Sequence, residues 1–105
     1  EESNRKVLEM SPEKYEEVSN LSEKLRITLA EAFQTKDPGG KLAQQAAELH
    51  RQWLGFFWDR YSPEAHMGLV QMYVDDERFT AYYDVEQPGT AAFLRDAVRI
   101  YTGLK

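Results

Sequence analysis

Few side chains in this sequence could carry out chemistry. The chain has two histidines, His50 and His66, and no cysteine. It therefore has no thiolate nucleophile, no disulfide and no cysteine-bound zinc, and two histidines on different helices do not make a metal site by themselves. A nucleophile elbow, a phosphate-cradling glycine-rich loop and paired carboxylates in an apolar setting are also missing from the sequence. We expect no catalysis, no cofactor and no bound metal.

Aromatic residues are the strongest candidates for binding. Nine of the 13 aromatic residues lie between Trp53 and Tyr83, several of them in AHMGLVQMYVDDERFTAYYD at positions 65 to 84. Each such ring buries about 150 to 250 Å², so the cluster could form the core of the fold, the wall of a ligand pocket, or both. Tyrosine and tryptophan carry a polar group that needs a partner when buried, which makes the tyrosine hydroxyls the better candidates for ligand contact. The predicted ligand-binding residues are Trp53, Phe57, Tyr61, His66, Tyr73, Phe79, Tyr82 and Tyr83.

Several of these residues also have a structural interpretation. A small helical domain needs aromatic residues in its core, and Phe57, Phe79 and Phe93 suit that role. Histidines beside apolar positions, such as His50 and His66, are more often hydrogen-bonded core residues than ligands to anything. Core and pocket therefore stay open as alternatives for this cluster.

The charged run Asp75-Asp76-Glu77-Arg78 divides the aromatic cluster. An aspartate at the start of a helix accepts hydrogen bonds from free backbone N–H groups, and a nearby arginine can pair with it. We interpret Asp76 and Arg78 as residues that cap a helix and pair across the turn, with direct ligand contact as the alternative. Structural roles are accordingly predicted for His50, Asp76 and Arg78.

Helical periodicity runs through almost the whole chain. Ser11 can cap a helix that has Pro12 at its first position, and apolar residues then recur at i, i+3, i+4 and i+7 as far as Phe33. Asp37-Pro38-Gly39-Gly40 breaks this pattern, and a second apolar stripe runs from Leu42 to near Trp58.

The second half of the chain predicts three more helices. The third opens with the same cap and proline signature at Ser62-Pro63-Glu64. Asp75 or Asp76 can cap the fourth, which Pro88-Gly89-Thr90 ends, and Gly103 is a stop for the fifth. The predicted inner face of the third helix consists of Ala65, Leu69, Met72 and Tyr73.

These patterns predict an all-α fold, since no segment alternates with period two. A chain of 105 residues fits one domain, and its short loops and wide apolar stripes favour helices that cross steeply around one core. The net charge of -5 argues against this segment binding a phosphate backbone. The longest apolar run, Trp53 to Trp58, is far shorter than the roughly 20 residues of a membrane span, and no signal peptide opens the chain. We expect no membrane partner and a cytoplasmic location.

Three strings resemble a known family. HRQWLGFFW from His50, YSPEAHMGLVQMYVDDERFTAYYD from Tyr61 and PGTAAFLRDAV from Pro88 look like the TipAS domain, the thiopeptide-antibiotic-binding effector domain of some MerR-type transcription activators. The resemblance covers the second half of the chain continuously and the first helix only in general character. It implies a compact globin-like arrangement of about five helices without haem, and a deep cleft lined by apolar and aromatic groups.

The same resemblance implies partners outside this segment. Regulators of this kind carry a helix-turn-helix and a dimerisation helix ahead of the effector domain. The chain begins at Glu1 without a methionine and is acidic, so we expect DNA binding and homodimer formation to belong to a preceding part of a longer protein. Residues 1–105 would then form a single TipAS-like domain.

One departure from the family affects the mode of binding. Members that capture thiopeptides irreversibly use a cysteine, and this chain has none. We therefore expect reversible binding of an apolar, thiopeptide-like antimicrobial compound. In TipAS domains the segment ahead of the well-ordered helices closes over the antibiotic, which makes residues 11–36 a candidate lid. The alternatives are a haem-binding protein with His50 or His66 as axial ligand, and an interaction module whose aromatic groove receives a partner helix.

Overall fold

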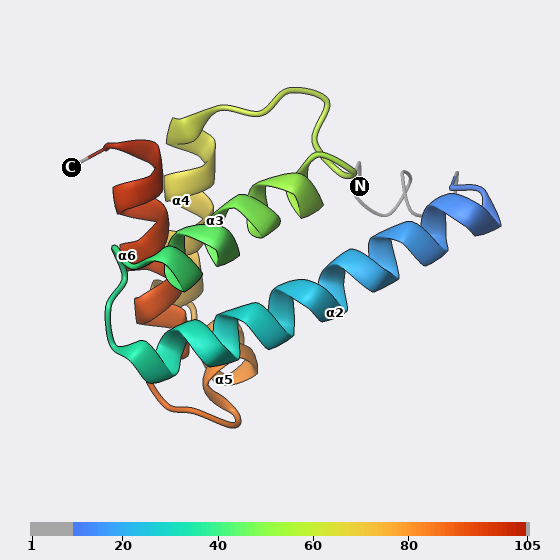
Figure 1. Cartoon of the computed structure of the whole chain (residues 1–105). Helices are drawn as coiled ribbons and strands as arrows, with labels where there is room; N and C mark the ends of the chain where they lie inside the picture. The colour runs from blue at the N-terminus through green and yellow to red at the C-terminus, as the bar shows by residue number, and fades with distance from the viewer. Residues whose placement is uncertain (1–9, 105) are drawn as a thin grey trace.

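The computed structural model describes residues 10–104, and helices form its regular structure (Figure 1). In chain order they are α2 (Pro12–Thr35), α3 (Lys41–Leu54), α4 (Pro63–Asp75), α5 (Glu77–Asp84) and α6 (Thr90–Thr102). No strand occurs among these described residues. The predicted all-α fold of five helices is confirmed, and its globin-like arrangement stays a prediction.

The helix starts follow from local capping. The Ser11 hydroxyl accepts a hydrogen bond from the Lys14 N–H at 3.1 Å, and the Ser62 hydroxyl accepts one from the Ala65 N–H at 3.0 Å. Each serine is followed by a proline, whose fixed φ suits the first helical position and whose missing N–H needs no partner there. Both starts therefore lie where the sequence predicts them.

Two helix ends differ from the prediction. Helix α3 ends at Leu54 instead of near Trp58, because Gly55 begins a series of turns in which the Trp58 N–H still reaches the Leu54 carbonyl at 2.9 Å. Helix α5 ends at Asp84, four residues before the expected proline. The Asp84 carboxylate instead accepts hydrogen bonds from the N–H groups of Gly89 and Ala91, both at 2.9 Å, and so caps α6.

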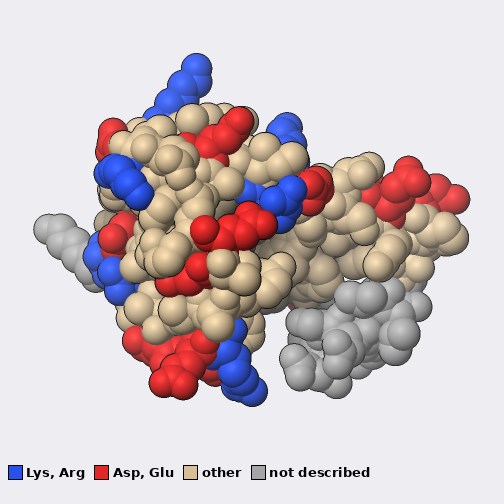
Figure 2. All heavy atoms as spheres, turned by 90° about the horizontal axis from the view of Figure 1, so that it is seen from below, with Lys and Arg blue, Asp and Glu red and all other residues tan. Residues whose placement is uncertain are grey.

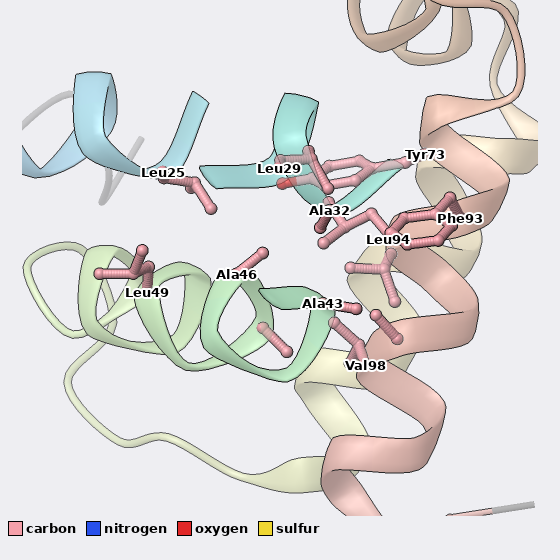
Figure 3. Packing of buried hydrophobic residues seen from close by; sticks show 13 residues of the cluster. Leu25, Leu29, Ala32, Ala43, Ala46, Leu49, Tyr73, Phe93, Leu94 and Val98 are labelled. Carbon is pink, nitrogen blue, oxygen red and sulfur yellow. The ribbon is translucent and has the colours of Figure 1, made fainter. Parts of the chain in front are cut away.

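The helices form two antiparallel pairs that cross steeply (Figure 1). Helix α2 packs along α3, and α4 packs along α6. The core face of α3 carries the fully buried Ala43, Ala46 and Ala47, of which Ala46 points toward α2 (Figure 3). Such small side chains let two helix backbones approach closely. Leu94 and Val98 of α6, both fully buried, complete the core on the other side.

The face of α4 that enters the core matches the prediction only in part, since Tyr73 is buried as expected and Leu69 and Met72 pack against the core cluster. Its buried residues are His66, Val70 and Tyr73, whereas Ala65 is exposed and the predicted Leu69 and Met72 are only partly buried. The prediction treated His66 as a neighbour of the apolar face. Burial of His66 becomes favourable because both of its ring nitrogens find hydrogen-bond partners, as described below.

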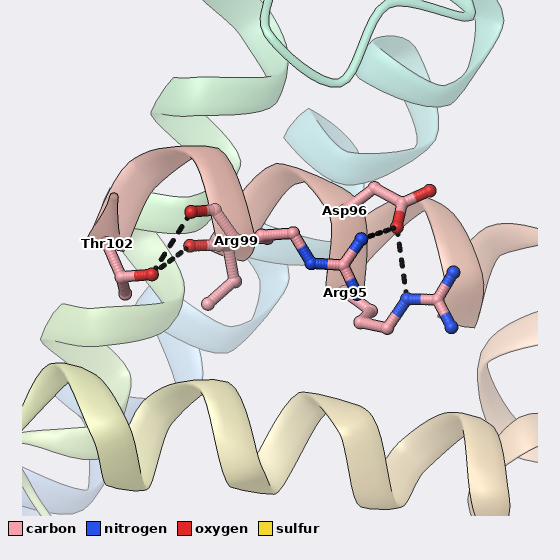
Figure 4. Close-up of polar contacts among 5 residues, drawn as sticks. Arg95, Asp96, Arg99 and Thr102 are labelled. Atoms are coloured by element: carbon pink, nitrogen blue, oxygen red, sulfur yellow. Dashed lines mark hydrogen bonds and ion pairs between the residues drawn. The ribbon is translucent and has the colours of Figure 1, made fainter. Parts of the chain in front are cut away.

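Polar side chains on α6 form hydrogen bonds within the helix (Figure 4). Asp96 accepts hydrogen bonds from Arg95 at 3.0 Å and from Arg99 at 3.4 Å. The Thr102 hydroxyl donates to carbonyls of the preceding turn at 2.9 and 3.2 Å. Exposed pairs of this kind contribute little to stability, so the buried face of α6 dominates its energetics.

Charge on the surface is mixed. On the face shown in Figure 2, acidic and basic side chains are interspersed and no continuous basic surface forms. Within residues 10–104, no helix combines the length and the apolar character that crossing a membrane requires.

Candidate functional site

A cavity of about 680 Å³ opens between α2 and α5. This volume lies within the roughly 300–1,000 Å³ of typical small-molecule pockets. We define its floor as the buried lining residues Leu25, Leu29, His50, Tyr73 and Thr90. Its rim consists of the exposed lining residues Arg26, Arg78, Phe79, Tyr82, Val85 and Glu86. The floor thus combines two leucines with three side chains that carry a polar group, and the rim combines exposed rings with charges of both signs.

Helix α5 forms the aromatic wall of the cavity. None of its eight residues is buried, although Phe79, Tyr82 and Tyr83 all line the cavity. Tyr73 of α4 stacks on Phe79 with ring centroids 5.4 Å apart and lies 4.8 Å from the Tyr83 centroid. Tyr82 meets Tyr83 edge to face at 5.1 Å. Tyr82 and, to a smaller extent, Phe79 therefore leave ring surface available to a bound molecule, while Tyr83 also packs partly against the core.

Local polar contacts hold this short helix in place. Asp76 caps α5 by accepting the Arg78 N–H at 2.9 Å, and its other oxygen accepts the Arg78 guanidinium at 2.8 Å. The Thr80 hydroxyl donates to the Tyr73 carbonyl at 2.6 Å. Beyond α5, the Gln87 amide accepts from Gln34 and donates to the Ala30 carbonyl at 3.4 Å. These bonds join α5 to α4 and join the segment after α5 to α2, so both walls of the cavity are tied together.

A hydrogen-bonded chain of four side chains leads away from the cavity floor. His50 Nε2 lies 3.3 Å from the Tyr73 hydroxyl, and His50 Nδ1 lies 2.8 Å from His66 Nε2. His66 Nδ1 in turn lies 2.7 Å from the Tyr61 hydroxyl. We call Tyr61, His66, His50 and Tyr73 the buried polar chain. Within the described residues, no buried side-chain nitrogen or oxygen lacks a hydrogen-bond partner.

Burial keeps both histidines of the buried polar chain neutral. Desolvation, with a smaller contribution from His66, lowers the pKa of His50 to about 3. Desolvation and the positive charge of Arg51 lower the pKa of His66 to about 4. Burial also raises the pKa of the Tyr73 hydroxyl and that of the neighbouring Tyr83 hydroxyl. Near neutral pH the floor of the cavity therefore presents uncharged polar groups.

No cluster of ligating side chains accompanies these histidines. In the part of the chain that the structure describes, no group of three or more His, Cys, Asp or Glu side chains could hold a metal ion. All four ring nitrogens of His50 and His66 are engaged in hydrogen bonds. The arrangement suits non-covalent binding of a mainly apolar molecule.

The chain matches a known protein family. The model of the TipAS antibiotic-recognition domain matches residues 1–101. The chain belongs to this family. It is also 34% identical over 100 residues to the HTH-type transcriptional activator TipA of Streptomyces coelicolor and, equally, to that of Streptomyces lividans. The match covers 92% of this chain and 39% of each relative, so the chain spans well under half of their length. No solved structure matches the chain.

The predicted site residues of this TipAS domain fall into two groups. Trp53, Tyr73, Phe79, Tyr82 and Tyr83 line the cavity. Phe57, Tyr61 and His66 are not among the lining residues: Phe57 packs on Trp53 with centroids 4.8 Å apart, and the other two belong to the buried polar chain. His50, for which a structural role was predicted, belongs to both the chain and the floor. Contact of these residues with a ligand stays a prediction.

Other lining residues were not predicted from the sequence. Leu25, Arg26 and Leu29 supply the α2 wall, and Gln87 and Thr90 supply the edge near α6. Leu25 and Leu29 are part of the apolar stripe of α2, but the stripe alone does not tell which helix it faces. The sequence carries no local signal for Gln87, whose role depends on contacts with residues more than 50 positions away.

Proposed function

We propose that this chain is the ligand-sensing domain of a MerR-type transcription activator and binds an apolar, thiopeptide-like antimicrobial compound reversibly in the cavity between α2 and α5. Membership of the TipAS family and similarity to the TipA activators support the regulatory role. The observation that carries the proposal is the partly exposed aromatic wall of α5, where three rings line one cavity. The role is binding without catalysis, and contact with DNA belongs to a preceding part of a homodimeric longer protein.

Reversibility follows from the side chains present. The chain has no cysteine, so a thiol cannot add to an unsaturated group of the compound. Apolar burial at about 25 cal/mol per Å² supplies the affinity, while Tyr73, His50 and the rim arginines orient the compound. A covalent adduct that survives denaturation in intact-mass spectrometry would contradict this mode of binding.

Helix α2 is the proposed lid. Its segment from Ser22 to Ala30 lines the cavity, whereas Val18 is the buried residue in the part ahead of it. Movement of α2 would therefore open or close the cavity, at the cost of the hydrogen bonds that Gln87 makes with Gln34 and with the Ala30 carbonyl. A ligand that favours the closed form would provide the two states that signalling needs. Amide hydrogen exchange, read separately for residues 11–36 and 42–104, should show ligand-induced protection mainly in the first range. Slow exchange of α2 in the free protein, unchanged by a bound compound, would exclude the lid.

Titration with a panel of thiopeptides and other cyclic antimicrobials tests the proposed function. Trp53 lines the cavity and Trp58 does not, so the fluorescence response should vanish in Trp53→Phe and persist in Trp58→Phe. Tyr82→Ala should weaken binding about tenfold, because it removes ring surface from the rim. The proposal fails if no compound binds, or if binding is equally strong after Tyr82→Ala and Phe79→Ala.

The haem alternative is not supported by the site. An axial histidine needs a free ring nitrogen, and those of His50 and His66 are all hydrogen-bonded. Hemin added to the protein should give no Soret shift that depends on either histidine.

A further inference from the structure

The 2.8 Å contact between His50 Nδ1 and His66 Nε2 restricts the protons of both rings. A neutral imidazole carries one proton, on either nitrogen. At this distance one of the two facing nitrogens must carry a proton and the other must not, since two N–H groups would collide and two lone pairs would repel each other. Both rings are fully buried, so no bulk water can relieve a mismatch. The tautomer of His50 therefore fixes the tautomer of His66.

The restriction extends to both ends of the buried polar chain. If His66 donates from Nε2 to His50, then His50 donates from Nε2 to the Tyr73 hydroxyl, and His66 Nδ1 accepts from Tyr61. If His50 donates from Nδ1, every bond reverses: Tyr73 donates to His50, and His66 Nδ1 donates to Tyr61. Both rings thus carry Nε2–H in the first direction and Nδ1–H in the second.

The two directions present different groups to the cavity. In the first, the Tyr73 hydroxyl accepts from His50, and its own proton points to Tyr83 or to a bound molecule. In the second, the Tyr73 proton is used by His50, and oxygen lone pairs face the cavity. In a reversal from the first direction to the second, each of the three hydrogen-bonding protons moves across its bond to the next group toward Tyr73. The half-buried Tyr61 then takes up a proton from water, and Tyr73 releases its former hydroxyl proton to water. Each hydroxyl and each ring keeps one proton.

We propose that His50 and His66 form a coupled tautomeric pair that lets the cavity floor act as hydrogen-bond donor or acceptor according to the ligand, and that transmits this choice to Tyr61. The pair suits neutral heteroaromatic compounds with a single ring donor or acceptor among apolar rings. His50 and His66 are specificity-determining residues, with His66 acting only through His50. The lowered pKa values of both histidines agree, because an uncharged pair is required. The response of the pair to a ligand, which we call the ligand-reading part, rests on the proposed function. The coupling between the two rings does not.

The coupling can be tested without any ligand. The Tyr73→Phe substitution removes the acceptor for a proton on His50 Nε2. The Tyr61→Phe substitution removes the acceptor for a proton on His66 Nδ1. A buried N–H without an acceptor costs more free energy than a buried lone pair without a donor. We therefore expect Nδ1–H at both histidines in Tyr73→Phe and Nε2–H at both in Tyr61→Phe. Long-range ¹H–¹⁵N spectra of ¹⁵N-histidine protein at neutral pH distinguish the tautomers. Tyr101→Phe is the matched control, since its ring lies 6.2 Å from that of His66 while its hydroxyl bonds to Glu48 and Arg51.

The tautomer of His66 in Tyr73→Phe is the decisive result for the coupling. Opposite tautomers of His66 in Tyr73→Phe and Tyr61→Phe, with wild-type spectra in Tyr101→Phe, would support the pair, because Tyr73 bonds to His50 and not to His66. The proposal is overturned if the two histidines of one protein differ in tautomer, or if His66 has the same tautomer in both variants.

Three bicyclic probes test the ligand-reading part: quinoline, which only accepts, indole, whose N–H donates, and naphthalene, which does neither. In the wild type, quinoline should raise the Nε2–H population of both rings, indole the Nδ1–H population, and naphthalene neither. Tyr61→Phe should increase the affinity for quinoline relative to indole by about fivefold, although Tyr61 does not line the cavity. Equal responses to quinoline and indole would overturn the ligand-reading part.

If none of the three probes binds, both the proposed binding function of the cavity and the ligand-reading part are contradicted. The ligand-free measurement still decides whether the two histidines are coupled.

Discussion

Helices α5 and α6 follow one another in the chain, yet they place their apolar side chains in opposite ways. Six of the 13 residues of α6 are buried, among them Leu94, Ala97 and Val98 with no exposed surface. Helix α5 carries three aromatic rings and buries no residue. Apolar area inside a core stabilises the fold, whereas apolar area left on a cavity wall is available for binding. The difference indicates that core packing and cavity lining are largely assigned to separate helices.

The largest effect on stability should come from the core face of α6. Leu94→Ala removes a fully buried side chain and should lower the free energy of unfolding by about 2–5 kcal/mol. Ile100→Ala, on the same helix but about half exposed, should change it by less than about 0.5 kcal/mol. Urea denaturation followed by circular dichroism measures both. Equal losses in the two variants would mean that α6 does not form the core as described.

Lowering the pH should destabilise the core and the cavity floor together, because the two histidines connect them. Their folded pKa values, about 3 and about 4, lie below the ordinary value of 6.5. Stability is therefore full above pH 6.5 and falls as the pH decreases, since the unfolded chain takes up protons that the folded protein does not. Between about pH 7 and 5 the loss should reach about 2 kcal/mol for each histidine.

Urea denaturation at several pH values measures this loss, with tryptophan fluorescence and helical circular dichroism expected to change in one transition. The sequence holds two histidines, so NMR titration of their ring protons gives an unambiguous check. A histidine resonance that titrates near pH 6.5 in the folded protein would refute the assignment.

A smaller effect is expected at the junction of the two helices. Asp84 belongs to α5, but its carboxylate accepts the N–H groups of Gly89 and Ala91 at the start of α6. Asp84→Ala should therefore cost about 1 kcal/mol of unfolding free energy through the loss of a cap. Glu86→Ala serves as control, because Glu86 is exposed nearby. Unchanged melting of Asp84→Ala would show that α6 starts without help from α5.

The smallest effect on stability should follow from changes to the aromatic wall. Tyr82 is 73% exposed, so Tyr82→Ala should alter the free energy of unfolding by less than about 0.5 kcal/mol. The same variant should weaken ligand binding, as described for the titration. A loss of stability comparable to that of Leu94→Ala would remove the division of roles between α5 and α6.

Local signals explain what could be predicted from the sequence. The starts of α2 and α4 depend on Ser11 and Ser62 with the prolines that follow them, and all the atoms involved lie within three residues. The buried face of α4 could not be read in this way, because the burial of His66 requires Tyr61 and, 16 positions away, His50. The cavity could not be predicted from a local pattern either, since Leu25 and Leu29 line it together with residues of α5 that lie about 50 positions further along the chain.

The alanines of α3 affect the entropy cost of packing other helices against α3. An alanine side chain has no rotamer to lose, so the contact through Ala43, Ala46 and Ala47 forms with almost no side-chain entropy cost. The same core cluster holds Leu25 and Leu29 of α2 and Leu49 of α3, whose longer side chains fill the space beside the alanines (Figure 3). The entropy cost of ordering the α3 surface is therefore small where it supports the helix that carries the α2 wall of the cavity.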